Sequence, residues 1–340
     1  MNMTHEIKTL LYTAVNWNQA GIKTVLATVV DLEGSSYRKP GVRMLLNEHG
    51  EAVGAVSGGC VEKDILHQAQ SVFRSGKAKM MTYDGRYRIG CEGLLYILLE
   101  PMVLSEKHLK AMNGSFRDRR SFKAETFYFP EPGEYEGIGS RLIFEGETIP
   151  IYPAFQGDKL EDPSLFTQSY PPVFQLYIFG AEHDAVKLCQ AAHQLGWEVT
   201  IVASPDEDKS KDFFPGASRL IIPSFDKIDT SVLDKQTAVV VMSHSLHKDV
   251  QYMIALKDAK PAYLGLLGPA HRRERILSEF LNYCPDASVE FLDQIHGPAG
   301  INLGAESAAE IAVSILAEIL SKLRGQKPMS LREKTGTIHG

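Results

Sequence analysis

From residue 175 onward, short apolar segments alternate with longer stretches of helical pattern. Five of these segments are strand candidates: 175–179, 199–203, 219–222, 238–242 and 262–267. Neighbouring parallel strands need a crossover of a dozen or more residues, which is usually a helix. The spacing therefore predicts an α/β fold with a parallel, doubly wound sheet, whose last helix covers 307–323.

The first half of the chain shows a different pattern. Strand candidates lie at 24–32, 42–46, 52–56, 79–83 and 94–99, and helices are expected over 61–73 and 105–112. Residues 122–152 alternate between apolar and polar and are rich in turn residues, which predicts antiparallel hairpins. The pattern is typical of a mixed α/β domain.

The length of 340 residues suggests two domains. We expect an N-terminal domain over 1–157, a C-terminal domain over 173–325 and a polar tail over 326–340. The segment 158–172 contains three prolines and little apolar material, which predicts a linker.

The composition of the chain argues against several classes of protein. The chain has 42 acidic and 36 basic side chains and a formal net charge of -6, and its basic residues are scattered, so we expect no nucleic-acid-binding face. No apolar run approaches the roughly 20 residues of a membrane span, and the first residues lack a secretory pattern. Four cysteines are too few for a disulfide scaffold. We expect a cytoplasmic protein that binds no membrane.

Residues 34–41 (GSSYRKPG) follow a buried strand and concentrate glycine, hydroxyl and cationic groups. Backbone amides freed by glycine, with hydroxyls and a guanidinium nearby, bind a phosphate or another oxyanion. An ordinary hairpin turn with solvated charges explains the composition equally well. Arg43 lies in the next strand, where a charged side chain is more often paired or ligand-facing than idle.

Residues 57–62 (SGGCVE) join a strand to a helix. Glycines there let the backbone approach a ligand, and a helix start favours a thiolate, so Cys60 is a candidate nucleophile, metal ligand or sulfur-handling group. A small buried hydrophobe in a tight turn is the alternative. Cys91 offers a second thiol, but the two do not form a zinc motif, and we predict no metal site. Cys189 and Cys284 are predicted to be structural.

Residues 180–185 (GAEHDA) follow a strand and open a helix, which is the setting of a dinucleotide-binding turn. Glu182 stands where a second glycine would be, and Ala203 stands where an acidic ribose ligand would be, which argues against NAD(P). His244 ends a strand at the carboxyl edge of the expected sheet. His296 and Glu306 belong to glycine-rich segments before the last helix.

Taken in order, these segments resemble the xanthine dehydrogenase accessory protein family (XdhC/CoxI-like). The resemblance covers about 24–319 and is carried by GSSYRKPGVRMLL (34–46), AVSGGCVE (55–62), GCEG (90–93), GLLGPAHRRERI (265–276) and HGPAGINLGAESAAEIAVSILAEI (296–319). It implies a C-terminal Rossmann-like domain preceded by an N-terminal domain that carries the SGGC motif. The site residues that match the N-terminal motif are Gly34, Ser35, Ser36, Arg38, Arg43, Ser57, Gly58, Gly59, Cys60 and Glu62, with Cys91 near them.

The resemblance implies an accessory factor, or chaperone, for molybdenum hydroxylases. Such a factor transiently binds the molybdenum cofactor (molybdopterin), aids its sulfuration by a cysteine desulfurase and inserts it into a xanthine dehydrogenase-like apo-enzyme; we expect a non-catalytic homodimer. Arg38 and Arg43 are assigned to anionic groups, residues 57–59 to backbone contacts, and Cys60 to metal or sulfur. The rival hypotheses are an NAD(P)-dependent oxidoreductase that uses the C-terminal domain, and a docking scaffold without a ligand.

Overall fold

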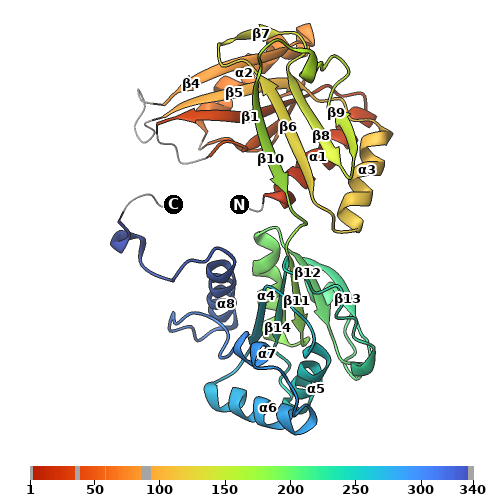
Figure 1. The fold of residues 1–340 in the computed structure, drawn as a ribbon, viewed down its shortest axis with the longest axis vertical. Helices are drawn as coiled ribbons and strands as arrows, with labels where there is room; N and C mark the ends of the chain where they lie inside the picture. The colour runs from red at the N-terminus through yellow and green to blue at the C-terminus, as the bar shows by residue number, and fades with distance from the viewer. Residues whose placement is uncertain (1–2, 35–38, 58, 86–92, 336–340) are drawn as a thin grey trace. The chain divides into compact units, whose positions relative to one another are not determined.

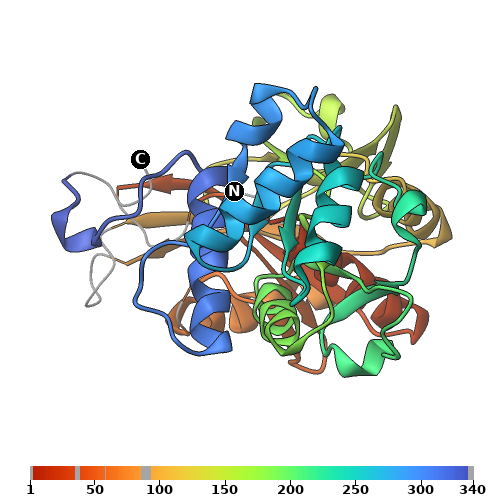
Figure 2. The same cartoon turned by 90° about the horizontal axis from the view of Figure 1, so that it is seen from below.

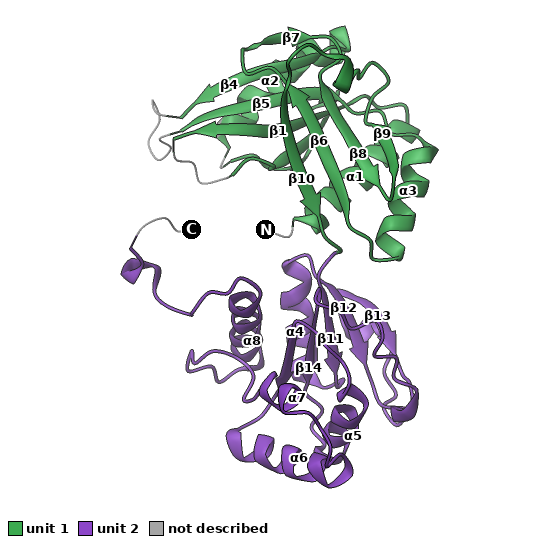
Figure 3. Cartoon of the chain, viewed as in Figure 1, with its two compact units in different colours: residues 1–172 green, residues 173–340 purple. Residues whose placement is uncertain are grey.

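The computed structural model describes residues 3–34, 39–57, 59–85 and 93–335. The chain divides between residues 172 and 173 into two units, shown in green and purple in Figure 3. No helix within the described ranges is long and apolar enough to cross a bilayer.

A six-stranded antiparallel sheet forms the centre of the first unit (Figure 1). Its strands, in spatial order, are β3 (Ala52–Gly54), β2 (Arg43–Asn47), β1 (Thr24–Glu33), β5 (Leu94–Pro101), β4 (Ala78–Asp84) and β7 (Gly133–Tyr135). Successive side chains of a strand point to opposite faces. Val25, Ala27 and Val29 therefore share one face, and helix α2 (Cys60–Ser75) packs its apolar stripe against them.

The other face of this sheet packs against helices and a second sheet. Leu26 and Leu45 join a core with α1 (Thr4–Gln19), α3 (Glu106–Arg117) and a four-stranded antiparallel sheet. The strands of that sheet, in spatial order, are β10 (Ser164–Tyr170), β6 (Phe122–Tyr128), β8 (Gly139–Phe144) and β9 (Glu147–Pro150). The antiparallel hairpins expected over 122–152 are confirmed, except that β7 leaves them to pair with β4.

The segment predicted as a linker, 158–172, contains a strand. Its residues 164–170 form β10, which pairs along its whole length with β6. Phe166, Gln168 and Tyr170 alternate with more exposed residues, so only one face of the strand is covered. This alternation is the signal of a half-buried strand. The prolines and the low apolar content of the segment are typical of a linker and obscure that signal.

The second unit contains a six-stranded sheet in which every neighbouring pair is parallel. Its strands, in spatial order, are β13 (Ala217–Ile221), β12 (Glu198–Val202), β11 (Gln175–Phe179), β14 (Thr237–Val241), β15 (Tyr263–Leu266) and β16 (Ile295–His296). The predicted α/β class with a doubly wound, Rossmann-like sheet is confirmed. Only the two-residue β16 lacked a signal in the sequence, since two residues show no periodicity.

Helices cover both faces of this parallel sheet. One face packs against α4 (His183–Gln194) and α8 (Ala308–Leu323). The other packs against α5 (Leu246–Leu256), α6 (Ala270–Tyr283) and α7 (Val289–Asp293). Figure 2 shows the same helices from below. Short 3-10 turns complete the chain at η1 (Gly157–Lys159), η2 (Lys211–Phe213), η3 (Phe225–Lys227) and η4 (Leu331–Glu333).

A carboxyl group is buried between the two sheets of the first unit. Glu100 of β5 has 0% of its surface exposed and accepts hydrogen bonds from the backbone N–H and the hydroxyl of Ser140 in β8, at 2.6 and 2.7 Å. Burial raises the pKa of Glu100 to about 7, although the Ser140 bonds and the Arg43 charge oppose this rise. The side chain thus connects the two sheets, although burial of its ionised form is electrostatically unfavourable.

This burial makes stability depend on pH. Glu100 binds its proton more tightly in the folded chain than at its ordinary value of 4.5, so the free energy of unfolding should fall as pH rises from 4.5 to about 7. Glu100→Gln keeps the shape and cannot ionise, so we expect its stability relative to the wild type to increase over this range. Urea unfolding between about pH 5 and about pH 8 measures the difference. A difference that does not change with pH would contradict the prediction.

Candidate functional site

The expected loops of the first unit meet at one edge of its six-stranded sheet. β1 ends at Glu33 and β4 ends at Asp84, and both residues lie opposite Leu94 at the start of β5 (Figure 1). β4 begins just after α2 ends, so the two elements run in opposite directions, and α2 begins near the end of β4. Gly34, the residue after β1, and the N-terminus of α2 therefore lie at the same edge.

Glu62 shapes the turn that opens α2. Its carboxylate accepts hydrogen bonds from the backbone N–H groups of Ser57, at 2.5 Å, and Gly59, at 2.7 Å, and from the Ser57 hydroxyl, at 3.2 Å. Partial burial opposes the charge of Glu62, but these hydrogen bonds outweigh it and lower the pKa. Gly59 has a φ of 115°, which favours glycine, and nothing lies within 4 Å of the position of a Cβ there.

These contacts explain the shape of the turn, while the predicted ligand contacts of its residues stay predictions. The N–H groups of Ser57 and Gly59 were expected to face a ligand, and Glu62 was expected to contact it. Glu62 occupies both N–H groups, so all three residues build the turn that presents the start of α2. A carboxylate at this position also offsets the positive end of the helix dipole.

Several predicted site residues lie outside the described residues: Ser35, Ser36, Arg38, Gly58 and Cys91. Cys60 is the first residue of α2, and its side chain also lies outside the described part of the chain. Gly34 is exposed and has a φ of 82°. The structure therefore places the backbone on which Cys60 and Gly34 lie, at a shared edge of the sheet.

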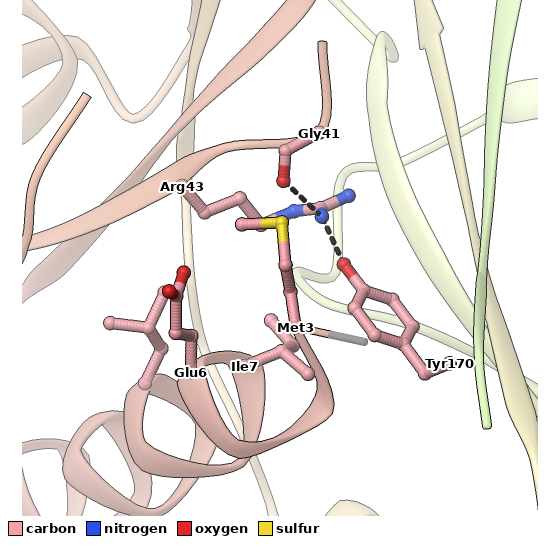
Figure 4. Close-up of a pocket in the computed structure, with 7 residues that line it drawn as sticks. Met3, Glu6, Ile7, Gly41, Arg43 and Tyr170 are labelled. Atoms are coloured by element: carbon pink, nitrogen blue, oxygen red, sulfur yellow. Dashed lines mark hydrogen bonds between the residues drawn. The ribbon is translucent and has the colours of Figure 1, made fainter. Parts of the chain in front are cut away.

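Arg43 faces away from α2. The next residue, Met44, belongs to the core that α2 covers, so the alternation along β2 directs Arg43 to the opposite face, between the sheets. Its Nη1 donates to the Gly41 carbonyl at 3.2 Å and to the Tyr170 hydroxyl of β10 (Figure 4). It also donates to Gln168 Oε1 of the same strand. The guanidinium also lies over the Tyr170 ring, 5.7 Å from its centroid. These partners all belong to the protein, and the assignment of Arg43 to an anionic group of a ligand stays a prediction.

The space beside Arg43 is small. A cavity of about 10 Å³ lies between the guanidinium and the side chains of Met3, Glu6 and Ile7 in and before α1 (Figure 4). This volume accommodates one water molecule and no pterin. The Nη2 atom of Arg43 is buried and has no hydrogen-bond partner within the described ranges.

The two candidate histidines of the second unit have different partners. His244 follows β14, and its Nε2 lies 3.2 Å from Asp184 Oδ2 in the first turn of α4. His296 lies in β16, with Nδ1 3.0 Å from Glu318 Oε1 and its ring stacked on Tyr263, 4.6 Å between centroids. Both lie toward the carboxyl edge of the parallel sheet, where open α/β sheets bind ligands, but no shared contact joins them among the described residues.

Glu318 of α8 was not singled out in the sequence. It accepts hydrogen bonds from the Tyr263 hydroxyl, at 2.5 Å, and the Gly300 N–H, at 2.7 Å, as well as facing His296. Partial burial opposes its charge, but the bonds from these partners lower the pKa of Glu318. An acidic residue in the middle of an otherwise apolar stretch of α8 was the available signal. Glu306, predicted as a cofactor contact, is exposed, and its backbone N–H donates to Glu310 at the start of α8.

The turn at Gly180 packs tightly against β14. Gly180 has a φ of 133°, and a Cβ there would lie 2.8 Å from the backbone of Met242, so close approach and conformation both require glycine. Lys209 donates to the Ala181 carbonyl at 2.6 Å and lies 3.6 Å from the carboxylate of Glu182. Lys209 thus pairs with the negative charge of Glu182 at this turn. The prediction against NAD(P) stays a prediction.

The two cysteines of the second unit are poorly placed for chemistry. Cys189 and Cys284 are free and buried, and burial raises the pKa of Cys189 to about 11, so its thiol is poorly suited to nucleophilic attack. Within the described ranges, no group of three or more His, Cys, Asp or Glu side chains could hold a metal ion.

Glu62→Gln tests the turn. The substitution removes the charge that the Ser57 and Gly59 N–H groups stabilise, and we expect a loss of about 1 kcal/mol of unfolding free energy at neutral pH. Because the pKa of Glu62 is lowered by folding, its contribution is present above its ordinary value of 4.5 and is lost as pH falls through the lower folded value. Urea unfolding should therefore show a difference that shrinks on acidification.

Asp64→Asn is the matched control, since it removes the same charge from α2 without touching the turn. It should leave stability within about 0.5 kcal/mol of the wild type. Equal effects of the two variants would mean that Glu62 acts only through the net charge of the helix.

Comparisons with known proteins follow the division into two units. The family model described as the XdhC and CoxI family matches residues 17–84, and the model described as the XdhC Rossmann domain matches residues 176–319. The first match contains β1, β2, β3, α2 and β4, and the second contains the parallel sheet.

Relatives and a solved structure match nearly the whole chain. The chain is 27% identical to a probable xanthine dehydrogenase subunit of Bacillus subtilis, over 88% of this chain and 92% of that protein. It is 26% identical to the "Molybdenum cofactor insertion chaperone PaoD" of Escherichia coli, over 94% and 89%. A crystal structure described as a xanthine dehydrogenase from Bacillus halodurans has a TM-score of 0.75 and 27% identity, over 93% of this chain and 96% of that one. With one family model on each unit and relatives that span both, the chain belongs to the XdhC and CoxI family.

Proposed function

We propose that the chain is an accessory factor for molybdenum hydroxylases. It transiently binds the molybdenum cofactor, aids its sulfuration together with a cysteine desulfurase, and inserts it into a xanthine dehydrogenase-like apo-enzyme. The similarity to PaoD carries the proposal, because it extends over 94% of this chain and 89% of that chaperone and so includes both units. We further propose that the chain acts in the cytoplasm as a homodimer.

The chemistry of the α2 edge supports cofactor handling. Cys60 is the first residue of α2, where the helix dipole favours a thiolate, and thiolates are soft ligands that suit transition metals. Glu62 supports this role indirectly, because it holds the turn from which α2 starts. Gly34 begins the loop at the same edge, and the hydroxyl and cationic side chains of residues 35–39 would supply contacts to anionic groups of the cofactor.

Arg43 and Glu62 have no direct part in this proposal. Arg43 is held between the sheets, and Glu62 is occupied by the turn. The proposed contacts are therefore those of Cys60 and the loop after Gly34. The molybdenum cofactor is the cargo of the protein, and the chain's own task is to hold it and release it to the client.

The test is retention of the cofactor by the full chain. Protein purified from a host that makes the cofactor should carry pterin and molybdenum, and Cys60→Ser should carry about tenfold less, as expected for the loss of one contact to a charged group. Cys284→Ser is the matched control, because that thiol is buried in the second unit. Pterin and metal analysis of the three proteins measures the effect.

Two results would contradict the proposal. A wild-type protein without pterin, from a host whose other molybdenum enzymes are loaded, would remove cofactor binding. Equal retention by wild type and Cys60→Ser would remove the role of the thiol. Activation of a xanthine dehydrogenase-like apo-enzyme by the loaded protein then tests insertion.

A further inference from the structure

A cavity in the second unit is lined by none of the residues that the proposed function uses. It has a volume of about 260 Å³ and is lined by Leu246, Pro269, His271, Arg272 and Arg275. Leu246 begins α5 directly after the loop from β14, and Pro269 precedes α6 after β15. The cavity therefore opens at the carboxyl edge of the parallel sheet, where open α/β sheets bind their ligands.

The lining of this cavity has one sign of charge. It contains two arginines and a histidine, and no acidic side chain lines it or lies in the first turn of α6. Arg275 and His271 are exposed, and neither has a hydrogen-bond or ion-pair partner within the described part of the chain. Two arginines that converge on one hollow whose lining contains no acidic side chain favour an anion there.

Arg272 is held in place from behind. Its Nη2 donates to Asp249 Oδ2 at 2.6 Å and to the Ser243 carbonyl at 3.1 Å. Asp249 is 1% exposed and also accepts hydrogen bonds from the N–H and the hydroxyl of Ser243, at 3.1 and 2.5 Å. The Arg272 stem passes over Gly268, where a Cβ would lie 2.5 Å from Cδ of the arginine. This buried support fixes an arginine side chain that also lines the cavity.

We propose that this cavity binds a phosphate group. Arginine forks match the geometry of phosphate oxygens, and two of them with a histidine suit a doubly charged anion. The volume of about 260 Å³ is somewhat below the roughly 300–1,000 Å³ of sites that enclose a whole drug-sized ligand. The occupant is therefore a free phosphate ion or the phosphate end of a larger ligand whose remainder lies outside.

Calorimetric titration of the full chain at constant ionic strength tests the proposal. The probes are inorganic phosphate and ribose 5-phosphate, with ribose as the uncharged partner of the second. We expect at least one phosphate compound to bind and ribose to give no signal. Arg275→Gln should weaken binding about tenfold, because it removes one hydrogen-bonding charge from an exposed position without disturbing the fold.

Arg324→Gln provides the matched control, since it removes the same charge from an exposed position in the same unit. It should leave the affinity unchanged. Binding of inorganic phosphate alone would identify a free ion as the occupant, and binding of ribose 5-phosphate would identify the end of a larger ligand; both support the site. Absence of binding by both anions, or equal weakening by the Arg275 and Arg324 variants, would overturn it, and neither result bears on retention of the molybdenum cofactor.

Discussion

Alternation of side chains across the six-stranded sheet is the constraint on which the first unit depends. One face of the sheet takes α2, and the other takes α1 and the second sheet. A residue therefore belongs either to the α2 side or to the inter-sheet side, according to its place in the strand. Arg43 and Met44 are neighbours in the chain, yet they serve different layers.

The inter-sheet layer contains charged groups whose burial must be compensated. Glu100 receives two hydrogen bonds from Ser140, and Arg43 receives its partners from β10. Buried charges of this kind are costly unless they are hydrogen-bonded, and each set of bonds crosses from one sheet to the other. These hydrogen bonds help to fix the alignment of one sheet against the other, which apolar packing alone defines less specifically. The opposite face packs against α2, which Cys60 begins.

In the second unit, separate clusters of polar side chains lie along the carboxyl edge of the parallel sheet. Asp184 holds His244, Glu318 holds His296, and Asp249 holds Arg272. The last of these clusters stands beside a cavity whose other basic side chains, His271 and Arg275, have no partner among the described residues. The architecture is that of a nucleotide-binding fold, but a fold alone does not specify its ligand.

Local pattern in the sequence determined most of the architecture. The parallel sheet, the helix at 61–73 and the SGGC junction follow from periodicity and glycine placement, because those signals act over a few residues. Tertiary structure alone decided three other matters. Residues 164–170 form a strand because β6 supplies its partner, the N–H groups of Ser57 and Gly59 belong to Glu62, and Arg43 is paired with Gln168, 125 residues away. In each case the deciding partner comes from the folded chain, and for β10 and Arg43 it is distant in sequence, so no local window contains it.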